Sequence, residues 1–147
     1  MQCPICKEDG ADTVLSCHPT HVLHSECLVR WEKISKTCPI CLVAVIRNGL
    51  DLQFIPPEKR SDEICLTAVT QNGKALEFVP EDKRSDKICL AAVTQEGWAL
   101  QYVPLDKRTG GICLAAVTQN GWALEFVPED MRTPEVCVTA SRSVVSC

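Results

Sequence analysis

The sequence lacks both a long apolar run and a cluster of basic residues. No stretch of about 18 consecutive apolar residues occurs, so no membrane span is expected. The formal net charge is −4, and lysine and arginine are spread over both halves of the chain. Because the phosphate backbone of nucleic acids requires basic patches, we do not expect a nucleic-acid partner.

What the sequence does have is cysteine and histidine at metal-ligand spacing. The pattern is Cys3-x2-Cys6, then Cys17-x3-His21-x2-His24-x2-Cys27, then Cys38-x2-Cys41, which gives eight residues in four couples. Two such residues separated by two others can curl round one metal ion, so each couple is half of a tetrahedral zinc site. Four halves predict two zinc ions.

A disulfide framework is the alternative interpretation of this pattern. It would suit a secreted protein, but the sequence shows no signal peptide, and histidines at ligand spacing have no place in a disulfide scheme. The chain has 11 cysteines, an odd total, and zinc needs thiolates. We therefore expect zinc and a reducing, cytoplasmic compartment.

The first 44 residues resemble the RING family in its two-histidine form. The ten-residue gaps from Cys6 to Cys17 and from Cys27 to Cys38 fit this family, as does the Cys38-Pro39-Ile40-Cys41 knuckle. In the family the first couple pairs with the third and the second with the fourth. The resemblance therefore implies one zinc ion on Cys3, Cys6, His24 and Cys27, and a second on Cys17, His21, Cys38 and Cys41.

His18 is the one ambiguous ligand. It directly follows Cys17, and adjacent side chains rarely reach the same ion without straining the backbone. His21 keeps the family spacing to His24, so we prefer His21.

RING resemblance implies a ubiquitin ligase that holds a ubiquitin-charged conjugating enzyme and promotes transfer to a substrate lysine. Closed zinc sites are scaffolds, and the catalytic benefit is the positioning of bound reactants. Family positions imply an apolar groove for the conjugating enzyme at Ile5, Trp31 and Pro39. Many active members carry a basic residue where Ile40 or Leu42 stands here. A non-catalytic binding adaptor with a structural zinc module is the alternative hypothesis.

From Val45 onward the sequence repeats with a period of 24. Glycine recurs in one register and cysteine in another, at Gly49, Gly73, Gly97 and Gly121 and at Cys65, Cys89, Cys113 and Cys137. Such a period indicates a solenoid, in which each unit buries its apolar face against its neighbours. We predict a RING module over residues 1–44, four mainly α-helical repeats over 45–140, and a degenerate fifth repeat or frayed cap over 141–147.

Each repeat carries helix signals. Ser61, Ser85, Thr109 and Thr133 stand where an N-cap belongs, and the glycine 12 residues after each of the first three is expected to stop the helix in the left-handed conformation. The following segment, 98–103 in one repeat, has Leu100 and Val103 three apart. That spacing favours a short second helix over the strand of a leucine-rich-repeat-like horseshoe.

Two positions of the repeat carry residue types that often have a function, cysteine and tryptophan. The four cysteines in register have no histidine nearby and are expected to be small buried hydrophobes, neither metal ligands nor ubiquitin acceptors. The position after each glycine varies between Leu50, Lys74, Trp98 and Trp122. Trp98 and Trp122 either form an exposed partner-binding face or cover the core of the next unit.

The phrase Ala-Val-Thr-Gln-Asn-Gly-x-Ala-Leu-Glu-Phe-Val-Pro-Glu resembles a little-characterised bacterial repeat family of unknown function. A ubiquitin-type module beside bacterial repeats would suit an effector secreted into the cytoplasm of a eukaryotic host. The expected partners are a conjugating enzyme, ubiquitin, and a protein substrate held by the repeats.

Overall fold

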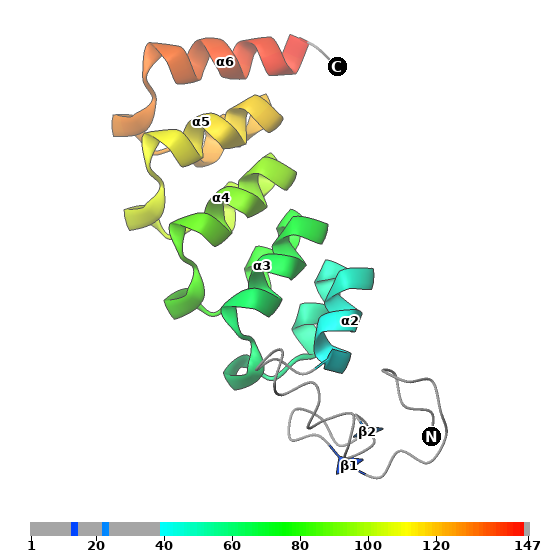
Figure 1. Ribbon diagram of the computed structural model, residues 1–147. Helices are drawn as coiled ribbons and strands as arrows, with labels where there is room; N and C mark the ends of the chain where they lie inside the picture. Colours follow the sequence, from blue (N-terminus) through cyan, green and yellow to red (C-terminus); the bar gives the residue numbers. More distant parts are fainter. Residues whose placement is uncertain (1–12, 15–21, 24–38, 146–147) are drawn as a thin grey trace.

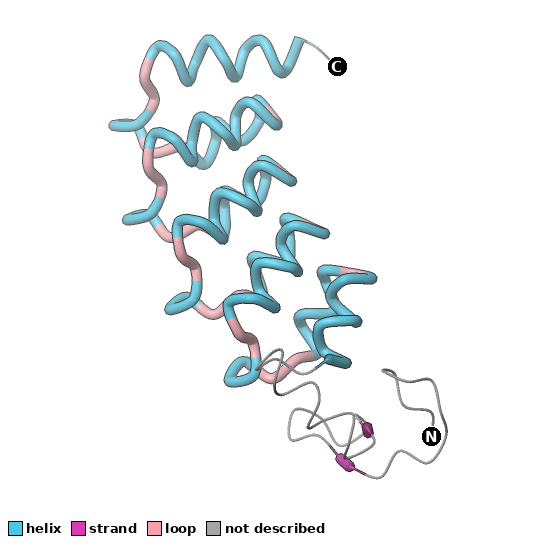
Figure 2. The backbone as a smooth tube through the Cα atoms, in the orientation of Figure 1, coloured by secondary structure: helices cyan, strands magenta, loops and turns pink. Residues whose placement is uncertain are grey.

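The described part of the chain is a stack of helical units. The computed structural model describes residues 13–14, 22–23 and 39–145, with side chains from Ile40 to Ser143. Two short strands, β1 (Thr13–Val14) and β2 (Val22–Leu23), pair antiparallel, with Val14 opposite Val22. From Pro39 to Val145 the regular elements are all helical (Figures 1 and 2). The prediction of a mainly helical repeat region is confirmed.

Two kinds of helix alternate along the stack. The α-helices are α2 (Pro39–Arg47), α3 (Asp62–Gln71), α4 (Asp86–Gln95), α5 (Gly110–Gln119) and α6 (Pro134–Val145). A six-residue 3-10 helix follows each of the first four: η1 (Gly49–Phe54), η3 (Gly73–Phe78), η5 (Gly97–Tyr102) and η7 (Gly121–Phe126). A three-residue 3-10 turn then leads to the next unit: η2 (Pro57–Lys59), η4 (Glu81–Lys83), η6 (Leu105–Lys107) and η8 (Glu129–Met131).

The residues that follow 44 and 140 lie inside helices. Helix α2 runs through residue 44, and α6 continues past residue 140 to Val145. The division of the chain at 44 and 140 therefore stays a prediction from the sequence.

Helices α3 to α6 begin after the predicted cap residues, but the side chain of Ser85 makes no capping hydrogen bond. Ser61 and Thr109 occupy the N-cap positions of α3 and α5, and their hydroxyl oxygens accept hydrogen bonds from the backbone N–H groups of Ile64 and Ile112 at 3.4 and 3.5 Å. Thr133 accepts from Val136 N–H at 3.4 Å in the same way. Such bonds satisfy amide groups that have no partner within the helix.

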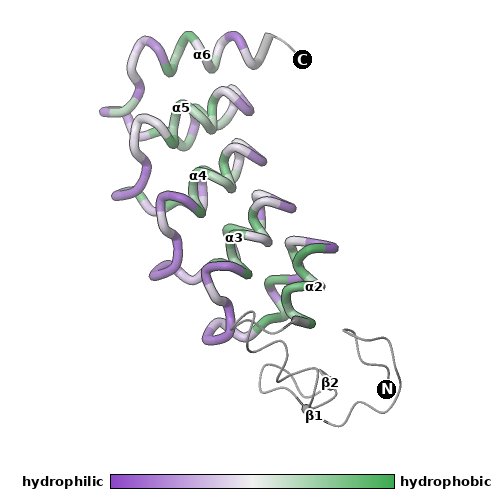
Figure 3. Tube along the Cα trace, viewed as in Figure 1, coloured by the Kyte–Doolittle hydropathy of each residue, from purple (hydrophilic) through white to green (hydrophobic). Residues whose placement is uncertain are grey.

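Each unit buries one stripe of its α-helix and one edge of its 3-10 helix. In α3 the buried residues are Ile64, Cys65, Ala68 and Val69. Helix α3 packs between α2 and α4, and η3 packs between η1 and η5. The buried residues form one continuous core from Cys41 to Ala140, whereas the turns between units are hydrophilic (Figure 3).

The second segment of each unit is a 3-10 helix, which confirms the helical alternative over the strand. In a 3-10 helix every third residue falls on the same edge. Gly97, Leu100 and Val103 follow this spacing and are all buried. The three-residue spacing of Leu100 and Val103 therefore reflects a tighter helix than the α-helix, packed on one edge.

The repeated glycine has a different role from the one expected. None of Gly49, Gly73 and Gly97 has the positive φ of a left-handed helix stop, so that prediction is wrong. Each instead begins a 3-10 helix that lies directly against the next α-helix. A Cβ atom on Gly97 would lie 2.5 Å from the carbonyl oxygen of Ala116, so a side chain is excluded by close approach of two backbones.

An arginine recurs in every turn, and those of the first three turns tie successive units together. Arg84 donates through Nε to Val79 O at 2.9 Å and through Nη1 to Tyr102 O, in the next unit, at 2.8 Å. Arg108 repeats both bonds, to Val103 O at 2.9 Å and to Phe126 O at 2.7 Å. Bonds from a charged donor to otherwise unpaired carbonyl groups are among the stronger hydrogen bonds in proteins.

We expect Gly97→Ala to destabilise the repeats, because its methyl group would overlap the carbonyl of Ala116. Overpacking of this kind typically costs about 1–3 kcal/mol. Gly110→Ala is the matched control, since a Cβ atom there meets nothing within 4 Å, and alanine favours the helix. Urea unfolding followed by circular dichroism measures both; equal midpoints for the two variants would contradict the close-approach explanation.

Candidate functional site

The predicted zinc ligands lie mostly outside the described residues. Cys3, Cys6, Cys17, His21, His24, Cys27 and Cys38 are in this group, as are the alternative ligand His18 and the groove residues Ile5 and Trp31. Strands β1 and β2 flank the segment 15–21 that carries Cys17 and His21. Pro39 is described as the first residue of α2, without its side chain.

Cys41 is the predicted ligand that the structure does describe. It lies in the first turn of α2 and is 1% exposed. It belongs to the same core as Val45 of α2 and Leu52 of η1. A buried thiol at the start of a helix fits a closed structural zinc site, in which no ligand position is open to solvent.

Cys41 also stands in the register of the repeats. Residues 40 to 42 are Ile-Cys-Leu, and the same three residues recur 24 positions apart at 64–66, 88–90 and 112–114. The last cysteine of the zinc pattern, Cys41, is thus part of the first repeat helix. The spacing of 24 between Cys41 and Cys65 is the signal in the sequence that the repeat register extends before Val45.

The register gives a physical reason for the two apolar residues of this knuckle. Ile40 and Leu42 are half-buried and pack against the solenoid core. Their counterparts Ile64 and Leu66 are buried and half-buried in the next unit. A basic residue at position 42, as in many RING proteins, would lose this apolar contact.

Three of the four cysteines in the 24-residue register are buried, as predicted, whereas Cys137 is half-buried. Cys65, Cys89 and Cys113 are each 0% exposed, and each thiol donates a weak hydrogen bond to the carbonyl of the arginine five residues earlier, at 3.6–3.7 Å. Burial raises the pKa of Cys65 to about 11 and shifts the pKa values of Cys89 and Cys113 upward as well. A thiol that stays protonated is a poor nucleophile.

Trp98 and Trp122 have different environments. Trp98 is half-buried, and its ring meets Phe126 of the next unit edge to face, with centroids 5.6 Å apart. Trp122 is 64% exposed. At the equivalent place in α3's unit, Lys74 is exposed and pairs with Glu96 at 3.4 Å. One tryptophan thus covers the next unit, and the other presents its ring to solvent.

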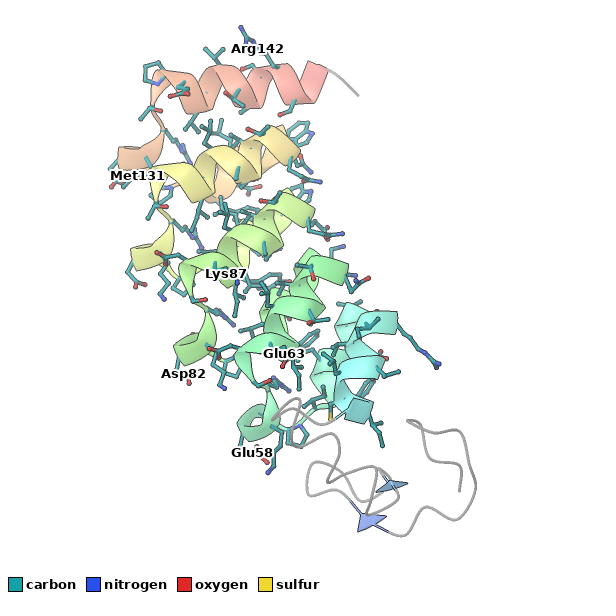
Figure 4. The ribbon with its side chains drawn as sticks, in the orientation of Figure 1. Glu58, Glu63, Asp82, Lys87, Met131 and Arg142 are labelled. Carbon is teal, nitrogen blue, oxygen red and sulfur yellow. The ribbon has the colours of Figure 1, made fainter. Side chains whose placement is uncertain are left out.

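The arginine of each turn is the feature that sequence reasoning missed. Arg60, Arg84, Arg108 and Arg132 recur without change in the polar turns, while the preceding lysine is replaced by Met131 in the last turn. Figure 4 shows Glu58, Asp82 and Met131 on three of the four turns, along one side of the stack. Strict recurrence among variable polar neighbours was the signal for a structural role.

Comparison with family models identifies both parts of the chain. The model "Domain of unknown function (DUF4116)" matches residues 40–82, 62–107 and 86–132, and the model "Ring finger domain" matches residues 1–42. The DUF4116 matches together span more than half of the chain, so it belongs to the DUF4116 family, with a zinc-binding RING finger of the two-histidine type at its N-terminus. The two models overlap at residues 40–42, on the first turn of α2.

Curated relatives match a short part of the chain. The human protein E3 ubiquitin-protein ligase RNF115 is 40% identical over 53 residues, which are 35% of this chain and 17% of that protein. E3 ubiquitin-protein ligase RNF126 of Xenopus tropicalis is 35% identical over 43 residues, 28% of this chain and 14% of that protein. E3 ubiquitin-protein ligase Iruka of Drosophila melanogaster is 36% identical over 53 residues, 35% and 14% respectively.

The chain therefore spans less than a fifth of the length of these relatives. The likeness supports a RING finger of the type found in E3 ligases. No solved structure matches the chain. Among the residues that the structure describes, none of the helices combines the length and the apolar character needed to cross a membrane.

We expect Cys65, Cys89 and Cys113 to resist alkylation at pH 8 in the folded protein, because their thiols are buried and protonated. Cys137, which is half-buried, should react first among the repeat cysteines. Mass spectrometry of iodoacetamide-treated protein, with and without urea, measures both. Rapid labelling of Cys89 without urea would contradict the burial argument.

The raised pKa also predicts a pH dependence of stability. Between pH 9 and 11 a Cys65 thiol in the unfolded chain loses its proton, whereas the folded one keeps it. The unfolded state then binds fewer protons, so stability should fall as pH rises through this window, and less so in Cys65→Ala.

Proposed function

We propose that this chain is a RING-type ubiquitin-protein ligase whose repeats recruit its substrate or partner. The observation that carries the proposal is the ligand pattern from Cys3 to Cys41. It lies within a segment that matches the Ring finger domain and relatives named as E3 ubiquitin-protein ligases. Ubiquitin and a ubiquitin-charged conjugating enzyme are the partners that such an activity requires.

In this proposal, two zinc ions hold the RING finger together. Cys3, Cys6, His24 and Cys27 form the first site; Cys17, His21, Cys38 and Cys41 form the second. Cysteine and histidine in sets of four suit zinc, and the burial of Cys41 suits a closed site. Zinc acts as a scaffold here and takes no part in bond breaking.

Transfer proceeds without a covalent intermediate on this chain. The conjugating enzyme binds an apolar groove formed by Ile5, Trp31 and Pro39, and its thioester is held ready for attack by a substrate lysine. The repeat cysteines are poor acceptors for ubiquitin, because burial raises the pKa of Cys65, Cys89 and Cys113. This supports positioning as the source of rate enhancement.

The shared helix supports a role for the repeats in presenting a substrate. Helix α2 carries Cys41 in its first turn and packs on α3. A partner held by the repeats is therefore linked to the zinc ligand Cys41 through packed helices, without a flexible linker between residues 39 and 47. A short, stiff connection raises the effective concentration of a bound lysine near the conjugating enzyme.

A non-catalytic adaptor is the second candidate function. Ile40 and Leu42 favour it, because both pack against the solenoid core at the positions where many active RING proteins carry a cation. In an adaptor the zinc module would serve as the N-terminal cap of the stack, and conjugating enzymes would not bind. A cytoplasmic location, in a host cell if the chain is a secreted effector, stays a prediction from the sequence.

We expect the purified chain to build ubiquitin conjugates when supplied with activating enzyme, ATP, ubiquitin and a panel of conjugating enzymes. Cys38→Ala should abolish this activity by removing a zinc ligand. Ile5→Ala and Trp31→Ala should abolish it while metal analysis still finds two zinc ions per chain. Loss of zinc from either of these two variants would remove the support for the groove assignment.

If a chain that retains two zinc ions forms no ubiquitin conjugates with any conjugating enzyme of the panel, the result would favour the adaptor. Leu42→Arg then tests the missing cation directly. Activity gained by this variant would show that the groove is competent and that only the cation was lacking.

We expect removal of zinc by a chelator to unfold α2 selectively, because its first turn carries Cys41. Structural zinc contributes on the order of 10 kcal/mol to the folding of small modules. Hydrogen exchange should show lost amide protection over residues 39–47 and retained protection in α4 and α5. Cys38→Ala should have the same effect as the chelator, whereas Cys65→Ala is the control. Unchanged amide protection of α2 after chelation would contradict the prediction that zinc stabilises this helix.

A further inference from the structure

The last unit of the stack presents a groove beside η7. Its volume is about 630 Å³, and its lining includes Trp122, Leu124, Glu125, Arg132, Ala140 and Ser141. These residues come from η7, from the turn that follows it and from the inner side of α6. In the earlier units, the corresponding place is filled by the next 3-10 helix, because η3 packs beside η1, η5 beside η3, and η7 beside η5.

One unit earlier, the equivalent groove beside η5 is filled by η7. There η7 lies beside η5, Phe126 meets Trp98 edge to face, and Phe126 O accepts a hydrogen bond from Arg108 Nη1 at 2.7 Å. Trp122 and Arg132 are the counterparts of Trp98 and Arg108, 24 residues further on. At positions 144 and 145, the counterparts of Asn120 and Gly121 that open η7, α6 continues with two valines, so no 3-10 helix begins there to supply the same aromatic ring and carbonyl.

Residues of the last unit are more exposed to solvent than the equivalent residues one unit earlier. Leu100 is 0% exposed under η7, whereas its counterpart Leu124 is only half-buried. Trp98 is half-buried and Trp122 is 64% exposed. Arg132 keeps the bond from Nε to Val127 O, at 3.0 Å, that holds its side chain in the orientation of the other arginines. The groove is therefore already formed, and its apolar surface faces solvent.

We propose that this groove binds a peptide segment of another protein with the chemistry of the repeat's own 3-10 helix. The segment carries the pattern Gly-x-Ala-Leu-x-aromatic-Val, forms a single 3-10 stretch against η7, places its aromatic ring on Trp122 and accepts a hydrogen bond from Arg132 through a backbone carbonyl. Because this groove is the open end of an interface that the chain forms three times within itself, its ligand chemistry is set by the same contacts.

A folded second copy of the chain does not satisfy this geometry. In every complete unit the 3-10 helix directly follows its own α-helix, separated by a single residue. If a second copy placed its 3-10 helix in the groove, its preceding α-helix would need the position that α6 occupies. The occupant is therefore a segment that lacks such a preceding helix, such as an exposed loop or a chain terminus.

The inference gives a chemical class to the partner that the repeats are proposed to recruit, and in that respect it rests on the proposed function. Peptide binding can nevertheless be measured without ubiquitin or conjugating enzyme. A failure of ligase activity and a failure of the groove are thus separate results.

The test titrates the zinc-loaded full chain with a synthetic peptide of residues 72–81, Asn-Gly-Lys-Ala-Leu-Glu-Phe-Val-Pro-Glu, which contains no tryptophan. The readouts are tryptophan fluorescence and the indole N–H signal of Trp122 in NMR spectra. We expect saturable binding, a shift of the Trp122 signal, and at least tenfold weaker binding of the peptide with Phe78→Ala.

Two variants of the chain complete the design. Trp122→Lys is chosen because Lys74 occupies the same place in another unit, so the fold should tolerate it, and it should weaken binding at least tenfold by fluorescence anisotropy of a labelled peptide. Leu105→Glu is the matched control: Leu105 is 72% exposed outside the groove, and glutamate stands at its counterparts Glu81 and Glu129. It should bind like the original chain.

Three outcomes overturn the proposal. The first is absence of binding at about 1 mM peptide, the weak end of specific affinities. The second is equal binding by Trp122→Lys and the original chain, with both shown to be folded by circular dichroism. The third is sedimentation that shows a dimer of the original chain and a monomer of Trp122→Lys, which would make a second copy the occupant.

Discussion

The arginine between units is the interaction on which the stack depends. A 3-10 helix of six residues leaves carbonyl groups at its end without partners, and so short an element has little stability of its own. One planar guanidinium meets this need on both sides of a junction: Arg84 binds the carbonyls of Glu77 and Val79 in its own unit and that of Tyr102 in the next. Each unit is thereby completed by its neighbour, as expected for a quasi-one-dimensional fold.

Close approach of backbones is the second constraint, and it explains the invariance of the glycine. The first residue of each 3-10 helix touches the last turn of the following α-helix, and its N–H donates to a glutamine there, as Gly73 does to Gln95 Oε1 at 2.7 Å. A side chain at that point would push the two units apart and would also separate Arg84 from Tyr102. Glycine and arginine thus act on the same junction from opposite ends of the 3-10 helix.

The first and the last helices of the described stack differ in what lies beside them. At the start, the Ile-Cys-Leu of the first helix is also the end of the RING match, so Cys41, a predicted zinc ligand, is at the same time a core residue. At the end, α6 covers η7 but leaves Trp122 and Leu124 uncovered, and Arg142 lies on the outer side of α6 (Figure 4).

Residue type and spacing alone determined the local features. The helix caps Ser61, Thr109 and Thr133 and the burial of Cys65, Cys89 and Cys113 depend on chemistry within a few residues, so they could be predicted. The role of Gly97, the bonds of Arg84 and Arg108, and the difference between Trp98 and Trp122 could not. Each is decided by an atom 18 to 28 residues away, in the next unit: a carbonyl, a backbone or the ring of Phe126. Identical residues in identical local helices acquire different roles because the tertiary stack places a neighbour over one and none over the other.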